Sequence, residues 1–107
     1  MLSQQEISDR LEIQDLLYRY AELIDGKRFQ ALRAEVFHED AHVAYSAFGG
    51  SVGDREETIA FLEKAMTLFP NTQHLNANVQ IRVDGDEGTG RVMCLNGHVC
   101  WEGAPEQ

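Results

Sequence analysis

The sequence predicts an α+β domain in which helices from the first two thirds of the chain pack against an antiparallel sheet. Apolar residues recur at helical spacing in three segments before Pro70. Two long segments rich in β-forming residues follow, at about 72–83 and 89–101, and the glycine-bearing segment 84–88 between them is typical of a hairpin loop. Because helices and strands are segregated along the chain, an alternating α/β architecture is not expected.

A capping box predicts where the first helix begins. Ser3 and Glu6 have the S-x-x-E spacing in which each side chain bonds the backbone N–H of the other residue. Gly26 tolerates the conformation found just past a helix end, so the helix is predicted from about residue 4 to 25. Its apolar stripe, which Ile7 and Leu11 extend toward the N-terminus, consists of Ile13, Leu16, Leu17, Tyr20, Ala21 and Ile24.

A second, shorter helix and a strand are predicted next. The apolar face of this helix is formed by Phe29, Leu32, Val36 and Phe37. The strand spans about 41–48 and alternates in polarity, so that Val43 and Tyr45 share one face while His42 lies on the other. The pair Gly49-Gly50 is expected to interrupt this strand.

A third helix is predicted from a second capping sequence. Asp54 and Glu57 have the required spacing, and Pro70 is expected to end the helix because proline cannot continue it. The apolar stripe of this helix consists of Ile59, Leu62, Met66 and Phe69.

Length and composition predict a single folded domain over residues 1–107, since 43% of the residues are apolar and 25% are charged. The formal charge is −9, and no basic stripe with interleaved aromatic residues is present, which argues against nucleic acid as a partner. No apolar run of about eighteen residues exists, so no membrane span is expected. The N-terminal segment lacks the basic and apolar regions of a secretory signal.

The two cysteines, Cys94 and Cys100, are expected on one strand. At about 3.3 Å per residue they lie roughly 20 Å apart, and a disulfide needs Cα atoms within about 7 Å. We therefore expect reduced thiols, which is typical of a cytoplasmic protein.

Two of the four histidines are candidates for acid–base chemistry. A hairpin centred on Asp86 places His74 directly opposite His98, since each lies twelve residues from it. A bulge near residues 76–78 would break this pairing. Unbroken alternation gives the first long strand a polar face, with His74 and Asn76, opposite an apolar face. This polar face is either solvated or the lining of a cavity in a curved sheet, where histidine can exchange a proton near neutral pH.

Asp25 and Tyr45 complete the candidate set. Asp25 ends the first helix, where a carboxylate meets the negative end of the helix dipole, so a role other than helix stabilisation is worth considering. A solvated helix-end residue is the alternative. Tyr45 lies in the middle of a strand, and it is either a core aromatic residue or a hydrogen-bond donor in a pocket.

Four segments resemble the SnoaL-like, or nuclear transport factor 2-like, superfamily: Tyr20–Lys27, Val36–Ala41, Thr72–Leu75 and Val83–Asp86. The resemblance covers nearly the whole chain. It implies a cone-like fold, in which a curved antiparallel sheet packs on three helices of the N-terminal half and encloses a pocket. The fold normally continues through further strands after Trp101, so a shortened form is expected. An open sheet edge invites pairing with another chain, and a homo-oligomer is expected.

Within that superfamily the chain is most similar to the scytalone dehydratase pattern. Asp25 falls on the aspartate that ends the first helix, but Ile24 replaces the preceding tyrosine. Tyr45, His74 and His98 fall on the pocket tyrosine and the two histidines. The resemblance implies that Asp25 orients a histidine, that the histidines transfer protons during water elimination, and that tyrosine stabilises the enolate.

The reaction implied is that of a cofactor-free lyase or isomerase, acting on a small hydroxylated cyclic ketone, polyketide or steroid-like compound. No cofactor or metal is expected. Candidate substrate-binding residues, which are equally candidates for the core, are Tyr20, Phe37, Val43, Leu62, Met66 and Asn96.

Two alternatives stay open. A non-catalytic binding or oligomerisation module of the same fold is the main one, because fold does not fix function. A metal site built on His38, His42 and His74 is the other, although the chain has no H-E-x-x-H motif and no cysteine cluster. The aspartate-arginine-aspartate set of related epoxide hydrolases cannot be placed in this sequence.

Overall fold

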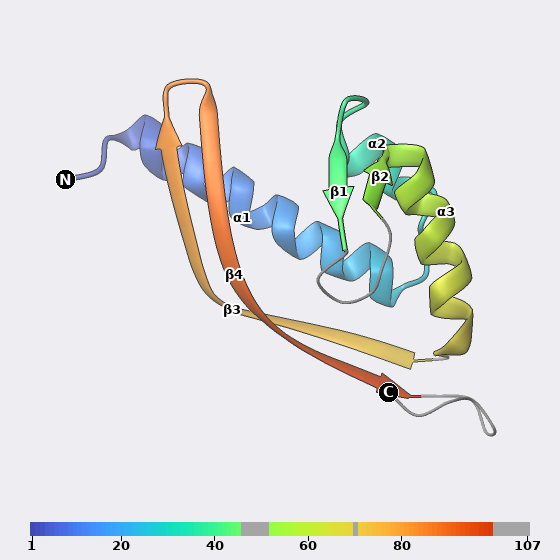
Figure 1. The fold of residues 1–107 in the computed structure, drawn as a ribbon. Helices are drawn as coiled ribbons and strands as arrows, with labels where there is room; N and C mark the ends of the chain where they lie inside the picture. The colour runs from blue at the N-terminus through green and yellow to red at the C-terminus, as the bar shows by residue number, and fades with distance from the viewer. Residues whose placement is uncertain (46–51, 70, 100–107) are drawn as a thin grey trace.

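The computed structural model of the chain describes residues 1–45, 52–69 and 71–99, except for the side chains of residues 98 and 99. Its elements are, in chain order, α1 (Gln4–Asp25), α2 (Ala31–Glu35), β1 (His42–Ala44), β2 (Val52–Asp54), α3 (Arg55–Ala65), the 3₁₀ helix η2 (Met66–Leu68), β3 (Asn71–Asp84) and β4 (Glu87–Val99) (Figure 1). The predicted α+β class is confirmed. In the described segments, no helix combines the length and the apolar character that a membrane span requires.

α1 begins and ends where the sequence predicts. The Ser3 hydroxyl accepts the N–H of Glu6 at 3.1 Å, and the Glu6 carboxylate accepts the N–H of Ser3 at 3.4 Å, which completes the capping box. The helix ends before Gly26, as predicted, but Gly26 has φ of −81° and the residue in the left-handed region is Lys27, with φ of 57°. The predicted extension of the apolar stripe is wrong, however, because Ile7 and Leu11 are 47% and 57% exposed. Figure 1 shows the reason: the N-terminal half of α1 projects away from α2 and α3.

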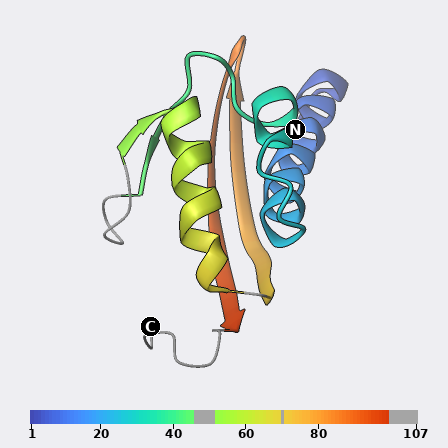
Figure 2. The same ribbon diagram turned by 90° about the vertical axis from the view of Figure 1, so that its right-hand side faces the viewer.

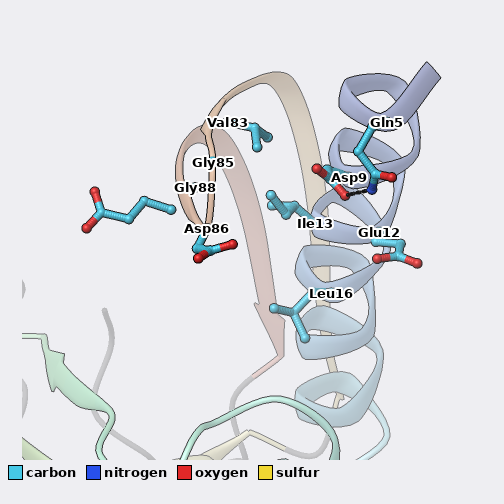
Figure 3. Close-up of a pocket in the computed structure, with 10 residues that line it drawn as sticks. Gln5, Asp9, Glu12, Ile13, Leu16, Val83, Gly85, Asp86 and Gly88 are labelled. Carbon is cyan, nitrogen blue, oxygen red and sulfur yellow. Dashed lines mark hydrogen bonds between the residues drawn. The ribbon is translucent and has the colours of Figure 1, made fainter. Parts of the chain in front are cut away.

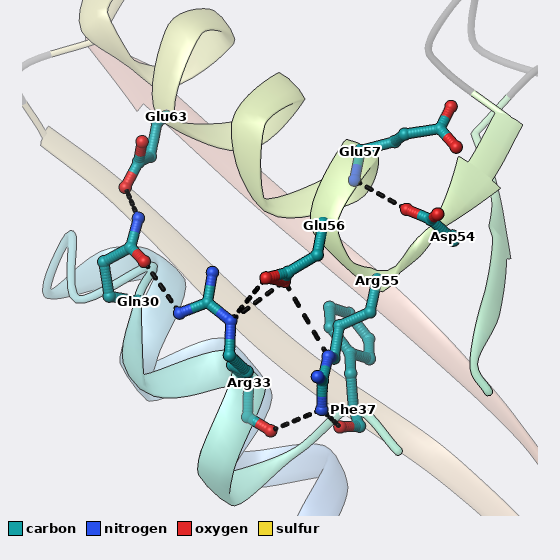
Figure 4. Close-up of polar contacts among 8 residues, drawn as sticks. All are labelled: Gln30, Arg33, Phe37, Asp54, Arg55, Glu56, Glu57 and Glu63. Carbon is teal, nitrogen blue, oxygen red and sulfur yellow. Dashed lines mark hydrogen bonds and ion pairs between the residues drawn. The ribbon is translucent and has the colours of Figure 1, made fainter. Parts of the chain in front are cut away.

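The hydrophobic core lies where the C-terminal half of α1 meets α2 and α3. Its buried side chains are Leu23, Ile24, Phe29, Leu32, Ile59 and Leu62. Polar contacts also join α2 to α3 (Figure 4): Arg33 Nε donates to the two oxygens of Glu56 at 2.7 and 2.9 Å, and Arg55 donates to the carbonyl of Phe37. Because the Arg33–Glu56 pair is exposed, the buried apolar side chains supply most of the stability.

A short hairpin pairs β1 with β2, in the register His42 opposite Asp54 and Val43 opposite Gly53. Val43 and Tyr45 are half-buried while His42 is exposed, which confirms the predicted alternation. β2 was not expected, because its three residues carry no strand pattern. Residues 46–48 of the predicted strand and the predicted break at 49–50 lie outside the described residues.

α3 starts at its predicted cap, where Asp54 Oδ1 accepts the N–H of Glu57 at 2.8 Å. The α-helix ends at Ala65, earlier than expected, and η2 carries the chain on to Phe69, which is 5% exposed. The expected stop at Pro70 lies outside the described residues.

The turn of the long hairpin is tighter than the predicted loop. Asp84 pairs with Glu87, so the turn consists of Gly85 and Asp86 alone. Gly85 has φ of 59°, in the left-handed region that glycine adopts without a steric penalty. The hairpin is therefore centred between these two residues and not on Asp86, which already shifts the predicted register by one residue.

A β-bulge then shifts the register a second time. It lies between Ala77 and Gln80, and it contains Asn78 with φ of 52°. As a result, His74 pairs with Asn96.

The predicted cross-strand pair of His74 and His98 is therefore wrong. His98 lies opposite Thr72, two pairs further from the turn than the pair of His74 and Asn96. The prediction assumed a loop with an odd number of residues and strand pairing without a bulge, and neither is present.

The bulge also exchanges the two faces of β3. Thr72, His74 and Asn76 are half-buried on the side that packs against α1, and beyond the bulge Ile81 is buried on that side. Leu75, by contrast, is 59% exposed. The prediction that His74 and Asn76 lie opposite the apolar face is wrong for this reason. Both long strands bend along their length (Figure 1), and α1 and α3 stand to either side of them in Figure 2.

Candidate active site

Asp25 accepts three hydrogen bonds from β3. The Thr72 hydroxyl donates to Oδ1 at 2.8 Å, the backbone N–H of His74 donates to Oδ2 at 2.8 Å, and His74 Nδ1 lies 2.6 Å from Oδ1. These contacts explain why a carboxylate occupies the unfavourable end of α1. The helix end holds Asp25 in place, and Asp25 in turn holds the His74 ring.

The pKa of Asp25 is lowered as the outcome of opposing effects. Burial raises it, but the hydrogen bonds from His74 and Thr72, together with the attraction of the His74 ring, outweigh burial. Asp25 is therefore an anion at neutral pH. An anionic acceptor at 2.6 Å places a proton on His74 Nδ1, which leaves Nε2 as the position able to take or give a proton.

Asn96 is the hydrogen-bond partner of the second ring nitrogen, His74 Nε2. Its Nδ2 lies 2.9 Å from His74 Nε2, and the two residues are a cross-strand pair. The Oδ1 of Asn96 is buried and has no hydrogen-bond partner among the described residues. With Nδ2 toward the ring, the amide N–H of Asn96 can donate to His74 Nε2 when that nitrogen carries no proton. After rotation the amide oxygen would accept from a protonated Nε2, so Asn96 can partner both protonation states of His74.

Two tyrosine hydroxyls meet beside the histidine. Tyr20 on α1 and Tyr45 after β1 are hydrogen-bonded through their hydroxyl groups. The Tyr20 ring stands edge-on to the His74 ring, with centroids 6.5 Å apart and an interplanar angle of 81°. Phe37 packs against Tyr20, and Phe61 packs against Tyr45, at centroid distances of 6.0 and 5.9 Å.

The pKa values of both tyrosines are raised, chiefly because burial disfavours the phenolate. The hydrogen bond acts in opposite directions on the pair, since it raises the pKa of Tyr20 further and lowers that of Tyr45. Either hydroxyl can be the donor of this bond. Because each hydroxyl carries one proton and the bond between them uses one, the other proton is free to donate to another group.

Sequence reasoning missed the hydroxyl role of Tyr20. Ile24 replaces the tyrosine of the dehydratase pattern and is completely buried in the core. Tyr20 lies one helical turn earlier on the same side of α1, and from there it brings a second hydroxyl to Tyr45. The four-residue spacing between these positions was the available signal.

Thr72 and Cys94 were also missed. Thr72 is the residue two before His74, and strand alternation alone places it on the same face. The pKa of the free thiol of Cys94 is raised, first by burial and then by the negative charge of Asp25. The thiol is therefore neutral, and it adds an uncharged group beside Asp25.

A depression of about 340 Å³ opens beside the Asp25–His74 pair. It is lined by Tyr18, Ala21, Glu22, Asp25, His74, Leu75 and Asn76. A different groove, of about 610 Å³, lies toward the opposite end of α1 against the hairpin turn (Figure 3). Its lining includes the carboxylates of Asp9, Glu12, Asp86 and Glu87, and none of the predicted site residues.

The remaining predicted residues have different surroundings. Leu62 is 4% exposed within the core, and Tyr20, Phe37, Tyr45 and Met66 are partly buried against it. Val43 is half-buried on β1. The backbone of His98 is placed by its pairing, but its side chain lies outside the described residues, as does Cys100.

The described residues do not assemble the metal site considered as an alternative. No group of three or more His, Cys, Asp or Glu side chains in the described segments is arranged to hold a metal ion. The side chain of His38 is 75% exposed and His42 is exposed, whereas His74 faces Asp25 and Asn96.

Comparison with known proteins places the chain in a family. Residues 5–106 match the SnoaL-like domain family. Uncharacterized proteins of Mycobacterium tuberculosis and Mycobacterium bovis are 45% identical over 96 residues, which is 90% of this chain. The chain spans 65% of the length of these relatives.

Two crystal structures share the fold. The Kfla4162 protein from Kribbella flavida has a TM-score of 0.78 and 25% identity, over 87% of this chain and 65% of its own. A provisionally assigned scytalone dehydratase from Novosphingobium aromaticivorans also has a TM-score of 0.78, with 26% identity over 92% of this chain and 66% of its own. With the family match over nearly the whole chain, these likenesses show that the chain belongs to the SnoaL-like domain family.

Proposed function

We propose that this domain is a cofactor-free lyase or isomerase of the dehydratase kind. Its substrate would be a small hydroxylated cyclic ketone, polyketide or steroid-like compound. The observation that carries the proposal is the hydrogen-bonded series of Asp25, His74 and Asn96 beside the paired hydroxyls of Tyr20 and Tyr45. A fixed imidazole next to a neutral hydroxyl donor is what enolate chemistry requires.

The first step is removal of a proton from the carbon next to the substrate carbonyl. His74 Nε2 is the base, because Asp25 holds the proton on Nδ1 and orients the ring. The electron pair of the broken C–H bond moves to the carbonyl oxygen. With Tyr20 as the donor to Tyr45, the Tyr45 hydroxyl donates a hydrogen bond to this developing enolate.

The second step is loss of water. The enolate electrons form the new carbon–carbon double bond as the C–O bond of the neighbouring hydroxyl breaks. That hydroxyl takes a proton from an acid, for which the candidates are His98 and the newly protonated His74, and it leaves as water. The products are an unsaturated ketone and water. With a substrate that lacks a leaving hydroxyl, return of the proton to a different carbon gives an isomer.

The lining of the substrate site is part of the same proposal. Phe37, Val43 and Met66 would contact the apolar part of the ligand, together with the ring of Tyr20. Leu62 would contribute from the core side. Asn96 would act on His74 and on the bound substrate, since its buried oxygen has no partner among the described residues.

Replacement of His74 tests the proposal. His74→Gln keeps a polar side chain but removes the proton-transfer group, so turnover of hydroxylated cyclic ketones, followed by ultraviolet absorbance of the unsaturated product, should be lost. His42→Gln is the matched control, because His42 is exposed and away from Asp25. Circular dichroism checks the fold of each variant. Turnover by His74→Gln at the rate of the unsubstituted chain would remove the mechanism.

A non-catalytic binding module is the second candidate. One observation favours it: Asn96 already occupies Nε2 of His74, so the ring is satisfied on both nitrogens without a substrate. Under this alternative, cyclic ketones raise the melting temperature of the unsubstituted chain and of His74→Gln equally. No new compound forms in either case.

We further propose that the domain associates with copies of itself and works in the cytoplasm. Each long strand pairs with just one other strand among the described residues, and Leu75, Met93 and Leu95 are exposed on the outer face of the hairpin. A single monomeric species in sedimentation velocity at high micromolar concentration would contradict the first part. Cell fractionation tests the second, which rests on Cys94 being a free thiol.

A further inference from the structure

A groove of about 670 Å³ on the long hairpin is lined by three arginines and no carboxylate. Its lining residues are Arg10, Val79, Gln80, Ile81, Arg82, Thr89, Gly90 and Arg91, and we call it the arginine groove. The chain carries 18 acidic and 9 basic side chains. A groove lined by three arginines and no acidic residue is therefore unusual for a chain with this net negative charge. The arginine groove shares no residue with the candidate active site and lies beyond the bulge from it.

The strand register brings two of these arginines together. Gln80 is paired with Arg91, and Arg82 is paired with Thr89. Paired residues share a face, as do residues two apart on one strand, so Arg82 and Arg91 are diagonal neighbours on one exposed face of the hairpin. Like charges at such positions repel each other, and an anion between them would remove the repulsion.

These three arginines also differ from the paired arginines of the chain. Arg19, Arg33 and Arg55 each lie within ion-pair distance of a glutamate.

In the described part of the chain, by contrast, no ion pair reaches Arg10, Arg82 or Arg91. Arg10 in addition has a buried Nε with no hydrogen-bond partner among the described residues. A buried guanidinium N–H without an acceptor is costly, so an acceptor from a ligand would be stabilising at this place.

We propose that the arginine groove binds the phosphate group of a small molecule. A guanidinium group donates in a planar fork that matches phosphate oxygens, and a phosphate offers more oxygens than a carboxylate to the neighbouring pair Arg82 and Arg91. The acidic remainder of the chain does not prevent this, because charges more than about 8–10 Å away are largely screened at physiological salt. Whether the phosphate is free or part of a larger molecule does not alter the chemistry of recognition.

Isothermal titration calorimetry with pyrophosphate and inorganic phosphate tests the proposal. We expect binding to the unsubstituted chain that weakens as salt is added. Arg82→Gln and Arg91→Gln should each weaken binding about tenfold, the effect of losing one charge-assisted hydrogen bond. Arg28→Gln is the matched control, since Arg28 is exposed, lies outside the arginine groove and has no ion pair among the described residues.

Several results would overturn the proposal. One is the absence of binding at millimolar pyrophosphate. Another is equal weakening by Arg28→Gln, which would mean that the whole surface attracts the anion without a defined site. A third is unchanged pyrophosphate binding in Arg82→Gln with a changed sedimentation coefficient, which would make the groove a contact between copies. His74→Gln should bind pyrophosphate normally, so failure of the proposed catalytic function leaves this test intact.

Discussion

Replacing Asp25 with asparagine tests the part of the site that the structure defines in most detail. Asp25→Asn keeps the shape of the side chain but removes the charge that three hydrogen bonds use. A hydrogen bond to a charged acceptor contributes about 1.5–3 kcal/mol, and a neutral one about 0.5–1.5 kcal/mol. A loss of about 1 kcal/mol per bond gives about 3 kcal/mol, and the partial exposure of the carboxylate reduces this to about 2 kcal/mol.

The effect on stability also depends on pH. Because the pKa of Asp25 is lowered in the folded chain, its contribution is complete above the ordinary aspartate pKa of about 3.9 and is lost as the pH falls through the folded value. The difference between the unsubstituted chain and Asp25→Asn should shrink below about pH 4.

Urea unfolding, followed by circular dichroism across this pH range, measures the difference. Asp9→Asn is the control, because Asp9 accepts from Gln5 on the exposed side of α1. Equal stability of Asp25→Asn and the unsubstituted chain at pH 7 would refute the reasoning. So would a difference that stays constant through pH 3.

Two further predictions concern the tyrosine pair and the bulge. Tyr20→Phe removes the hydrogen bond that lowers the pKa of Tyr45, so that pKa should rise further, as measured by carbon NMR titration of the phenol ring, whereas Tyr18→Phe should leave it unchanged. A fall in the pKa of Tyr45 would mean that the hydrogen bond from Tyr20 does not stabilise the Tyr45 phenolate. Asn78→Val places a β-branched residue at φ of 52° and should cost about 1–2 kcal/mol in urea unfolding, while Asn78→Gly should cost little. Equal stability of the two variants would mean that the bulge relaxes.

The helices of this chain could be predicted closely because their signals are local. The capping box defines the start of α1 from residues a few positions apart, and the structure confirms it. The end at Asp25 is also as predicted, although Lys27 and not Gly26 takes the left-handed conformation. The unusual position of Asp25 at a helix C-terminus indicated a role other than helix stabilisation, and in the structure its carboxylate accepts three hydrogen bonds from β3. Such inferences need no knowledge of distant contacts.

The site on the hairpin was less predictable because it depends on register. The two-residue turn and the bulge around Asn78 each move the pairing by one residue, and together they place Asn96 opposite His74. Neither feature follows from polarity, since Asn78 looks like any polar strand residue in the sequence. Tyr20 was predicted only as a substrate-binding residue. A helical stripe indicates which side of a helix is buried, but it does not indicate which group a tyrosine hydroxyl contacts.

The protonation of the His74 ring tests the central claim most directly. Long-range proton–nitrogen NMR at about pH 8, where an ordinary imidazole is neutral, reports which ring nitrogen carries the proton. The hydrogen bonds of Asp25 and Asn96 predict the proton on Nδ1, and loss of that preference in Asp25→Asn. A proton on Nε2 in the unsubstituted chain, or two forms in rapid exchange, would contradict the account.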